Sequence, residues 1–294
     1  MSLVINHNLM AMNAQRNLSE SYGALGTSTR RLSSGLRVGT AADDAAGLAI
    51  RELMRADIKS LNQGIRNAND AISMIQTADG ALGVIDEKLI RMKELATQAA
   101  TGTYNSDQRL IIDSEYQAMA SEITRIANAT DFNGIHLLNG NMSGENSSHD
   151  GSGLTSSGPV KVHFGTGNDS AEDYYYVSIG TSTASALGVG MGANNSISTQ
   201  QLAQESLDKL QNAIISKDKI RANLGALQNR LENTITNLSI QAENVQASES
   251  RISDVDVATE MTEFTRNQIL TQSAVAMLSQ ANGMPRMAMQ LIGG

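Results

Sequence analysis

The sequence predicts a mainly α-helical protein. Long antiparallel coiled-coil helices from both termini are accompanied by a β-hairpin and a small β-rich central insertion. Three observations support this fold class. Apolar residues recur at helical spacing through residues 1–140 and 201–294, whereas residues 141–200 are rich in Gly, Ser, Asn and Thr. With no Trp and only three Phe, the apolar content consists mainly of Leu, Ile, Met and Ala, which suits helices with narrow seams. Only two prolines interrupt the 294 residues, which leaves room for long helices.

The first helix is expected at residues 5–32, because one apolar face steps by three and four residues. The positions of this face are Leu18, Tyr22, Leu25, Thr29, Leu32 and Leu36. Gly35 ends the pattern. A second helix is expected after Asp43 and Asp44, whose carboxylates favour a helix N-terminus, and it extends to about residue 100. At 1.5 Å per residue this helix is about 85 Å long, so it needs a partner along its length.

The stripe of the second helix is Ile58, Leu61, Ile65, Ile72, Ile75, Leu82, Leu89 and Ala96. A third helix is expected at residues 106–129, where Ile112, Tyr116, Met119, Ile123 and Ile126 repeat the four-three step. Asn133-Gly134 follows between apolar residues and predicts a β-hairpin. In the insertion, residues 160–164 and 173–179 are strand-like, which predicts a small β-rich region on the surface.

The C-terminal part has the clearest periodicity, with a coiled-coil seam sustained over four heptads. The seam residues are Leu224, Leu231, Leu238, Val245 and Ile252. A final helix at residues 257–281 continues through Met261, Phe264, Val275 and Leu278. The stripes at the two ends are expected to pack against each other. Their surplus apolar surface suggests burial against other copies, with a monomeric antiparallel bundle as the open alternative.

Composition and motifs argue against several classes of function. The net charge is −8 without a basic stripe, which argues against nucleic-acid binding. Cysteine is absent, which excludes disulfides and thiolate metal sites, and no apolar run reaches the 18 residues of a membrane span. The sequence has no His-Glu-x-x-His motif, no phosphate-binding Gly-Lys-Ser/Thr loop and no Gly-x-Ser-x-Gly elbow. We therefore expect neither an enzyme nor a cofactor or metal site.

Several runs resemble a known family at both ends of the chain and in the same order. The most distinctive are Leu-Ser-Ser-Gly-Leu-Arg at residues 32–37 and Ala-Ala-Asp-Asp-Ala-Ala-Gly-Leu-Ala-Ile at residues 41–50. Further runs of the same kind lie at residues 1–8, 13–18, 91–98, 132–134, 251–256 and 278–282. These runs resemble bacterial flagellins, over roughly residues 1–140 and 200–294.

The resemblance implies a structural subunit that self-assembles into the flagellar filament and serves swimming motility. It implies a terminal inner-core domain (residues 1–40 and 257–294), a coiled-coil domain with the hairpin (41–140 and 201–256) and a surface-exposed variable domain (141–200). The implied partners are other flagellin subunits, the flagellar cap and hook-junction proteins, and an export chaperone at the C-terminal segment. The implied location is the extracellular filament, reached by flagellar type III secretion. The alternative is a hook–filament junction protein, which usually matches residues 41–50 poorly.

The resemblance also implies recognition by the host's Toll-like receptor 5. The family's receptor-contact positions correspond here to Arg91, Leu95, Gln98 and Glu115. The first three are spaced i, i+4, i+7, which places them on one helical face. The alternative is that Arg91 and Leu95 serve subunit packing.

Overall fold

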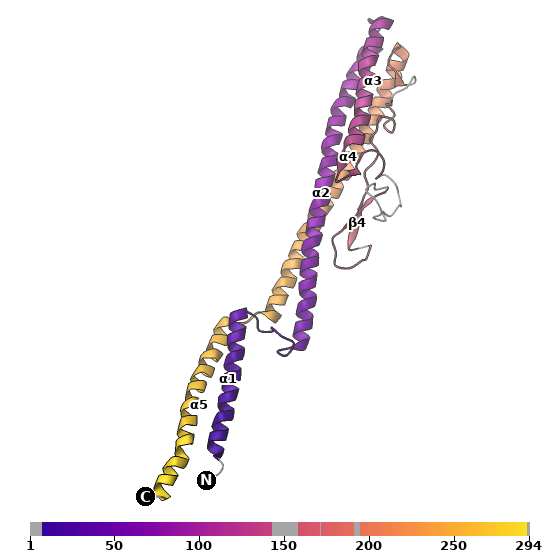
Figure 1. The fold of residues 1–294 in the computed structure, drawn as a ribbon. Helices are drawn as coiled ribbons and strands as arrows, with labels where there is room; N and C mark the ends of the chain where they lie inside the picture. Colours follow the sequence, from indigo (N-terminus) through magenta and orange to yellow (C-terminus); the bar gives the residue numbers. More distant parts are fainter. Residues whose placement is uncertain (1–7, 143–157, 171, 191–194, 293–294) are drawn as a thin grey trace. The chain divides into compact units, whose positions relative to one another are not determined.

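The computed structural model describes residues 8–142, 158–170, 172–190 and 195–292. The first seven residues of the expected inner-core segment and residues 143–157 of the insertion therefore lie outside the described part. The chain divides into two compact units, one from residues 1–58 and 243–294 and the other from residues 59–242. Two long helices, α2 (Ala45–Ala100) and α4 (Gln200–Ser253), contribute to both units (Figure 1). The mainly helical fold predicted from the sequence is confirmed.

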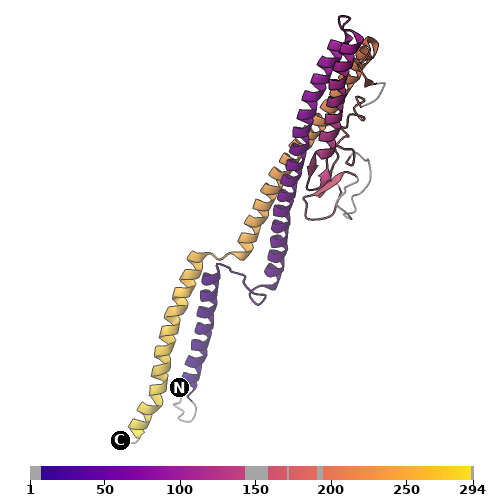
Figure 2. The same cartoon turned by 45° about the horizontal axis from the view of Figure 1, so that its top comes forward.

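The first unit is built on two antiparallel helices that lie side by side, α1 (Leu9–Ser34) and α5 (Val257–Ile292) (Figures 1 and 2). Asn8 caps the start of α1, because its side-chain oxygen accepts a hydrogen bond from the Ala11 amide at 3.0 Å. Gly35 ends α1 in the left-handed conformation, with φ at 73°, and donates its amide to the Arg31 carbonyl. The first helix thus begins and ends close to where the sequence predicted.

The connection from α1 to α2 is hydrogen-bonded to the end of α4. Leu36 forms a β-bridge with Asp254, and the Arg37 guanidinium donates to the Ile252 carbonyl at 2.7 Å. Within the connection, Asp43 accepts hydrogen bonds from the Thr40 amide and hydroxyl. These bonds, followed by the neighbouring Arg30 guanidinium, lower the pKa of the Asp43 carboxyl to about 2. The connection is therefore held by specific polar contacts.

The second unit is a bundle in which α3 (Ser106–Ala129) and α4 both run antiparallel to α2 (Figure 1). A capping box begins α3, in which Asn105 and Gln108 each bond the other's backbone amide. The buried positions of α2 follow two interleaved heptad series. One series is Leu61, Ala68, Ile75, Leu82, Leu89 and Ala96, and the other is Ala71, Ala78, Ile85, Met92 and Ala99. The alternation of large and small residues lets neighbouring helices approach closely over several turns.

Two small antiparallel sheets complete the second unit. Strands β1 (Asp131–Phe132) and β2 (Ile135–His136) form the predicted hairpin, with positive φ at Asn133 and Gly134 as a type I′ turn requires. Strands β3 (Val160–His163) and β4 (Tyr174–Val177) form the second sheet. Both sheets lie where the sequence predicted strands.

The described part of the insertion packs against the helices and is hydrogen-bonded to them, which the sequence did not predict. Its side chains Val162, Phe164 and Val177 are buried in the same apolar core as α2, α3 and α4. The Asn67 amide on α2 donates to the His163 carbonyl at 2.8 Å. The Arg230 guanidinium on α4 lies 3.5 Å from the centre of the ring of a β4 tyrosine. The core of the second unit thus extends beyond the coiled coil.

Candidate assembly interface

The seam between α1 and α5 is made mostly of small and polar residues. Its half-buried and buried positions step by three and four residues along both helices, as in a coiled coil. On α1 they are Ala11, Ala14, Leu18, Ser21, Leu25, Ser28 and Leu32. On α5 they are Glu260, Phe264, Asn267, Thr271, Ala274, Leu278 and Ala281. Such a seam lets two helices lie close together, and five of its fourteen residues are large and apolar, namely Leu18, Leu25, Leu32, Phe264 and Leu278.

Two polar contacts lie near opposite ends of this seam. Arg31, in the last turn of α1, lies 3.6 Å from the carboxylate of Glu260, in the first turn of α5. Each charge is placed favourably, because a cation stabilises a helix C-terminus and an anion a helix N-terminus. At the other end, the Asn8 side-chain amide donates to the Ala281 carbonyl at 2.8 Å. The two contacts agree with a single antiparallel register.

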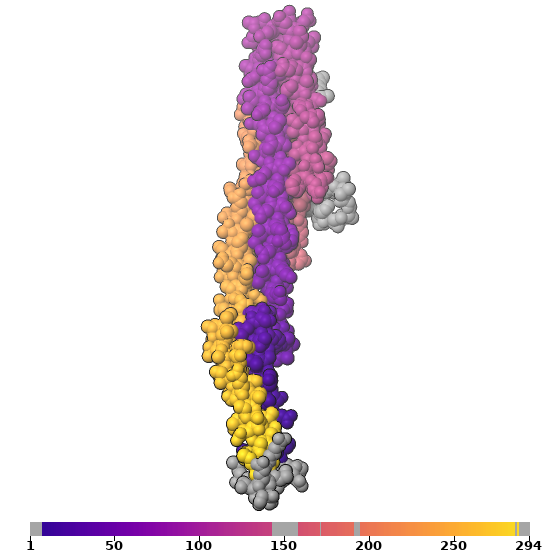
Figure 3. Space-filling model, turned by 60° about the vertical axis from the view of Figure 1, so that its left-hand side comes forward, coloured from indigo at the N-terminus to yellow at the C-terminus, as the bar shows by residue number. Residues whose placement is uncertain are grey.

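Eleven large apolar residues of α1 and α5 face outward, whereas five lie in the seam. Each of the eleven is at least 45 % exposed in the isolated chain. They are Leu9, Met10, Met12 and Tyr22 on α1, and Val257, Met261, Ile269, Leu270, Val275, Met277 and Met287 on α5. Figure 3 shows the two helices, indigo and yellow, in contact with each other. An ordinary helix pair buries most of its large apolar side chains between the helices, whereas here more of them face outward than lie in the seam. Exposed apolar surface on this scale is typical of a protein–protein contact.

The predicted faces of the terminal helices are only partly those that pack within the chain. Leu18, Leu25 and Leu32 lie in the seam, whereas Tyr22 of the same predicted stripe is 55 % exposed. On α5, Phe264 and Leu278 lie in the seam, and the other two predicted residues, Met261 and Val275, face outward. Periodicity located the helices, but it did not separate the inward side from the outward side.

Comparison with known proteins identifies the chain through both of its helical ends. Residues 5–143 match the bacterial flagellin N-terminal helical region, and residues 207–292 match the bacterial flagellin C-terminal helical region. The chain belongs to the bacterial flagellin family. A flagellin of Treponema pallidum is 42 % identical over 95 % of this chain and 96 % of its own length. A flagellin of Halalkalibacterium halodurans is 41 % identical over 99 % of this chain and 100 % of its own length.

A solved structure, a putative flagellar hook-associated protein from Vibrio parahaemolyticus, shares the fold at a TM-score of 0.55 and 13 % identity. The match covers 72 % of this chain and 100 % of that one. Flagellins are structural proteins of the flagellar filament and not enzymes, and the filament lies outside the cell. Among the described helices, none is both long and apolar enough to cross a membrane.

The predicted heptad seam of this flagellin lies inside the chain. Leu224, Leu231 and Leu238 are buried in the core that α4 shares with α2, and Val245 and Ile252 are half-buried in the first unit. The same heptad extends backward by seven residues to Lys217, which the sequence analysis missed. Continuing the count from Leu224 toward the N-terminus would have found this lysine in a leucine position.

Lys217 is 1 % exposed and is neutralised by two carboxylates. Its ammonium lies 2.5 Å from Asp86 on α2 and 2.8 Å from Asp218, the next residue on α4. One heptad before Asp86, Asp79 accepts two hydrogen bonds from Arg221, at 2.7 and 3.1 Å. A buried charge requires its partner, so this row of ion pairs favours one register of α4 against α2.

The four predicted receptor-contact residues lie on α2 and α3 and differ in exposure. Arg91 donates to Glu115 through two nitrogens, at 3.0 and 2.9 Å, and to Glu94 at 3.0 Å. These hydrogen bonds raise the pKa of Arg91 above its ordinary value, and the bonds to Glu115 contribute most. Gln98 is exposed and donates to the Tyr104 hydroxyl at 3.0 Å. Leu95 is 2 % exposed and packs in the core, so it is not accessible on this surface.

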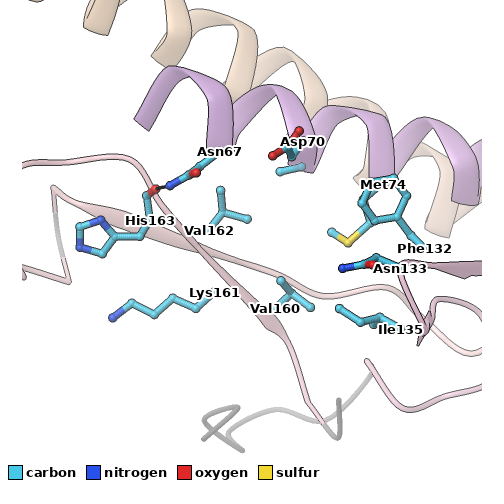
Figure 4. Close-up of a pocket in the computed structure, with 11 residues that line it drawn as sticks. Asn67, Asp70, Met74, Phe132, Asn133, Ile135, Val160, Lys161, Val162 and His163 are labelled. Atoms are coloured by element: carbon cyan, nitrogen blue, oxygen red, sulfur yellow. Dashed lines mark hydrogen bonds between the residues drawn. The ribbon is translucent and has the colours of Figure 1, made fainter. Parts of the chain in front are cut away.

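A pocket of about 370 Å³ lies between α2, the hairpin and β3 of the second unit (Figure 4). Its labelled lining is Asn67, Asp70 and Met74 from α2, Phe132, Asn133 and Ile135 from the hairpin, and Val160, Lys161, Val162 and His163 from β3. The pocket exists because the insertion docks on α2 beside the hairpin. Across the described ranges, no group of three or more His, Asp or Glu side chains is arranged to hold a metal ion.

Proposed function

We propose that α1 and α5 drive polymerisation of this flagellin by burying their outward apolar residues against other copies. The supporting observation is that eleven large apolar residues lie on the outward faces of α1 and α5, against five in the seam between the helices. Fully burying one Leu, Ile or Met side chain contributes about 1.5–3 kcal/mol. Burial of the outward residues would contribute toward offsetting the entropy lost when terminal segments become ordered on joining a filament, together with the helix hydrogen bonds and the seam contacts that form at the same time.

We propose that these contacts are head-to-tail, with the outward face of one copy against a different face of the next. Such heterologous contacts generate an open helical polymer when they do not close into a ring. The proposed filament core is therefore a repetition of terminal pairs, and the second unit stabilises each subunit through its own apolar core.

Paired substitutions on one helix test this proposal. In Ile269→Ser with Leu270→Ser, two outward apolar side chains become polar, whereas Gln268→Ser with Gln272→Ser changes exposed polar neighbours on the same helix. We expect the first pair to raise the critical concentration for polymerisation at least tenfold in sedimentation assays, and the control pair to leave it unchanged. Deleting residues 1–35 or 257–294 should abolish filaments in electron micrographs. Equal polymerisation of both pairs, or filaments from either deletion, would contradict the proposal.

Recognition by Toll-like receptor 5 is a second proposal, supported by the exposed Arg91, Gln98 and Glu115. Arg91→Ala and Glu115→Ala should weaken signalling in a cell reporter assay with monomeric protein. Arg66→Ala serves as the control. It removes an exposed arginine that precedes Arg91 on α2 and whose guanidinium donates to the Gln63 side-chain oxygen. Leu95→Ala is unsuitable because that side chain is part of the core. Unchanged signalling by both test variants would exclude this role.

The finer cellular roles also remain proposals. We expect export through flagellar type III secretion, a chaperone on the C-terminal segment before assembly, and cap and hook-junction proteins at the filament ends. The exposed apolar side chains of α5 favour such a chaperone, because they would otherwise promote aggregation. The alternative role as a hook–filament junction protein predicts short rings or monomers instead of long uniform filaments in negative-stain micrographs.

We also propose a three-part division, with residues 1–40 and 257–294 as inner core, 41–140 and 201–256 as coiled coil, and 141–200 as surface domain. The compact units of the fold divide instead near residues 58 and 243. Limited proteolysis of the monomer would distinguish the two divisions, because cleavage concentrates at exposed, poorly packed boundaries.

A further inference from the structure

A proline inside α5 leaves one backbone carbonyl without its helical partner. Pro285 lies within the helix, and its ring nitrogen carries no hydrogen to donate to the carbonyl four residues earlier, that of Ala281. Ala281 is only 8 % exposed, in the seam with α1. A buried carbonyl in this position needs another donor.

Asn8 supplies that donor from the other end of the chain. Its side-chain amide donates to the Ala281 carbonyl at 2.8 Å, while its side-chain oxygen accepts from the Ala11 amide at 3.0 Å. Among the residues that commonly cap helices, only Asn has both an acceptor and an amide donor on one side chain. Asp caps equally well but cannot donate, and Ser is one atom shorter. One residue therefore both begins α1 and completes the hydrogen bonding of α5.

The seam alone specifies the register of α1 and α5 weakly. Its small and polar residues repeat in heptads, so a slip of seven residues would place similar residues opposite one another. Only the native register brings Asn8 to the carbonyl that Pro285 leaves free. The Arg31–Glu260 contact at the other end agrees with the same register.

We infer that the hydrogen bond from Asn8 to the Ala281 carbonyl, which Pro285 leaves free, sets the register of α1 against α5 and so positions the outward apolar face for polymerisation. We call this contact the clasp. The inference rests on the proposed role of α1 and α5 in assembly. A slip of one heptad would displace the outward residues of one helix relative to the other by about 10 Å. Neighbouring copies would then meet a mismatched surface. Asn8 is thus a positioning residue for assembly.

A double-mutant cycle in the full-length chain tests the clasp. Asn8→Asp keeps the cap but removes the donor, and Asn8→Ser is its uncharged counterpart. Pro285→Ala restores a backbone N–H that can bond to the Ala281 carbonyl, so the amide of Asn8 is no longer required. We expect Asn8→Asp and Asn8→Ser to raise the critical concentration for polymerisation about tenfold in the Pro285 background, and less than threefold in the Pro285→Ala background.

A distance measurement reports the register directly. The chain has no cysteine, so spin labels on Asn17→Cys and Gln272→Cys, two exposed positions, have no background. Labelled protein is polymerised with an excess of unlabelled protein, so that only distances within one subunit contribute. In the native register these two positions lie opposite each other. We expect one distance for the otherwise unchanged chain, and a second, longer population when Asn8 is replaced, because an axial slip of about 10 Å moves the two labels apart.

Equal effects of the Asn8 substitutions in both backgrounds would overturn the clasp, as would an unchanged distance distribution. Failure of the outward apolar substitutions on α5 to impair polymerisation would instead overturn the proposed function, and the inference would fall with it. The two failures are distinguishable because they arise from different variants.

Discussion

Gly64→Ala should break the docking of the insertion on α2, because there is no space for one additional carbon atom. A Cβ at this position would lie 2.0 Å from the carbonyl oxygen of Phe164 and 2.7 Å from its carbonyl carbon. These are backbone atoms, so no side-chain rotation can relieve the clash. To restore ordinary van der Waals contact, β3 and α2 must separate by more than about 1 Å.

That separation has two costs. It breaks the 2.8 Å hydrogen bond from Asn67 to the His163 carbonyl, which contributes about 1 kcal/mol. It also loosens the packing of Val162 and Phe164, which are 6 % and 3 % exposed, and strain of this kind costs about 1–3 kcal/mol. Alanine regains about 1 kcal/mol through its higher helix propensity. The net loss in the free energy of unfolding is therefore about 1–3 kcal/mol.

Guanidinium unfolding of the monomeric chain, followed by far-ultraviolet circular dichroism, measures this loss. Near-ultraviolet dichroism adds a local signal, because three of the six tyrosines are Tyr174, Tyr175 and Tyr176. Gly80→Ala is the matched control, because a Cβ on that glycine of the same helix meets nothing within 4 Å. The free energy of unfolding of the control variant should rise by about 0.5–1 kcal/mol. If Gly64→Ala were as stable as the control, the close docking of β3 on α2 would be refuted.

Three further predictions concern ionisable groups. Lys217→Leu continues the leucine heptad and should change the free energy of unfolding by less than about 1 kcal/mol or raise it. Asp86→Ala should lower it by about 2 kcal/mol, because a buried ammonium loses a partner. Equal losses for the two variants in denaturant unfolding would contradict this. The pKa of Asp43 is lowered from 3.8 to about 2, so its stabilisation is present above pH 3.8 and is lost as the pH falls toward 2. Asp43→Asn should therefore flatten the acid part of the melting curve of the first unit, and a nuclear magnetic resonance titration of Asp43 near 4 would disprove the shift. Burial raises the pKa of Tyr116 to about 12, so its contribution to stability is present below pH 10 and is lost as the pH rises through 12. In an ultraviolet titration one tyrosine should ionise late, and Tyr116→Phe should remove that late step but no other.

Local sequence signals were sufficient to predict several elements of the fold. The third helix spans Ser106–Ala129 and the second ends at Ala100, as predicted, because apolar spacing, caps and breakers lie within a few residues of each boundary. Asn133-Gly134 determined the hairpin in the same way, since few other residue pairs adopt two consecutive positive φ angles. The flagellin motifs at both ends were likewise contiguous runs that could be recognised without a fold.

Tertiary structure decided which side of each helix faces inward and which distant groups meet. In α1 and α5 large apolar residues occur both in the seam, as at Leu25 and Phe264, and on the outward side, as at Met261, so hydrophobicity alone did not separate the two sides. Lys217 looks like a surface residue until Asp86 is placed beside it, and Gly64 looks like a weak point in a helix until the Phe164 carbonyl occupies its space. Asn8 and Ala281 stand at opposite ends of the chain, and no local pattern relates them. Hydrogen bonds, ion pairs and steric contacts depend on distances in space, and periodicity along the chain does not determine these until the helices have been packed.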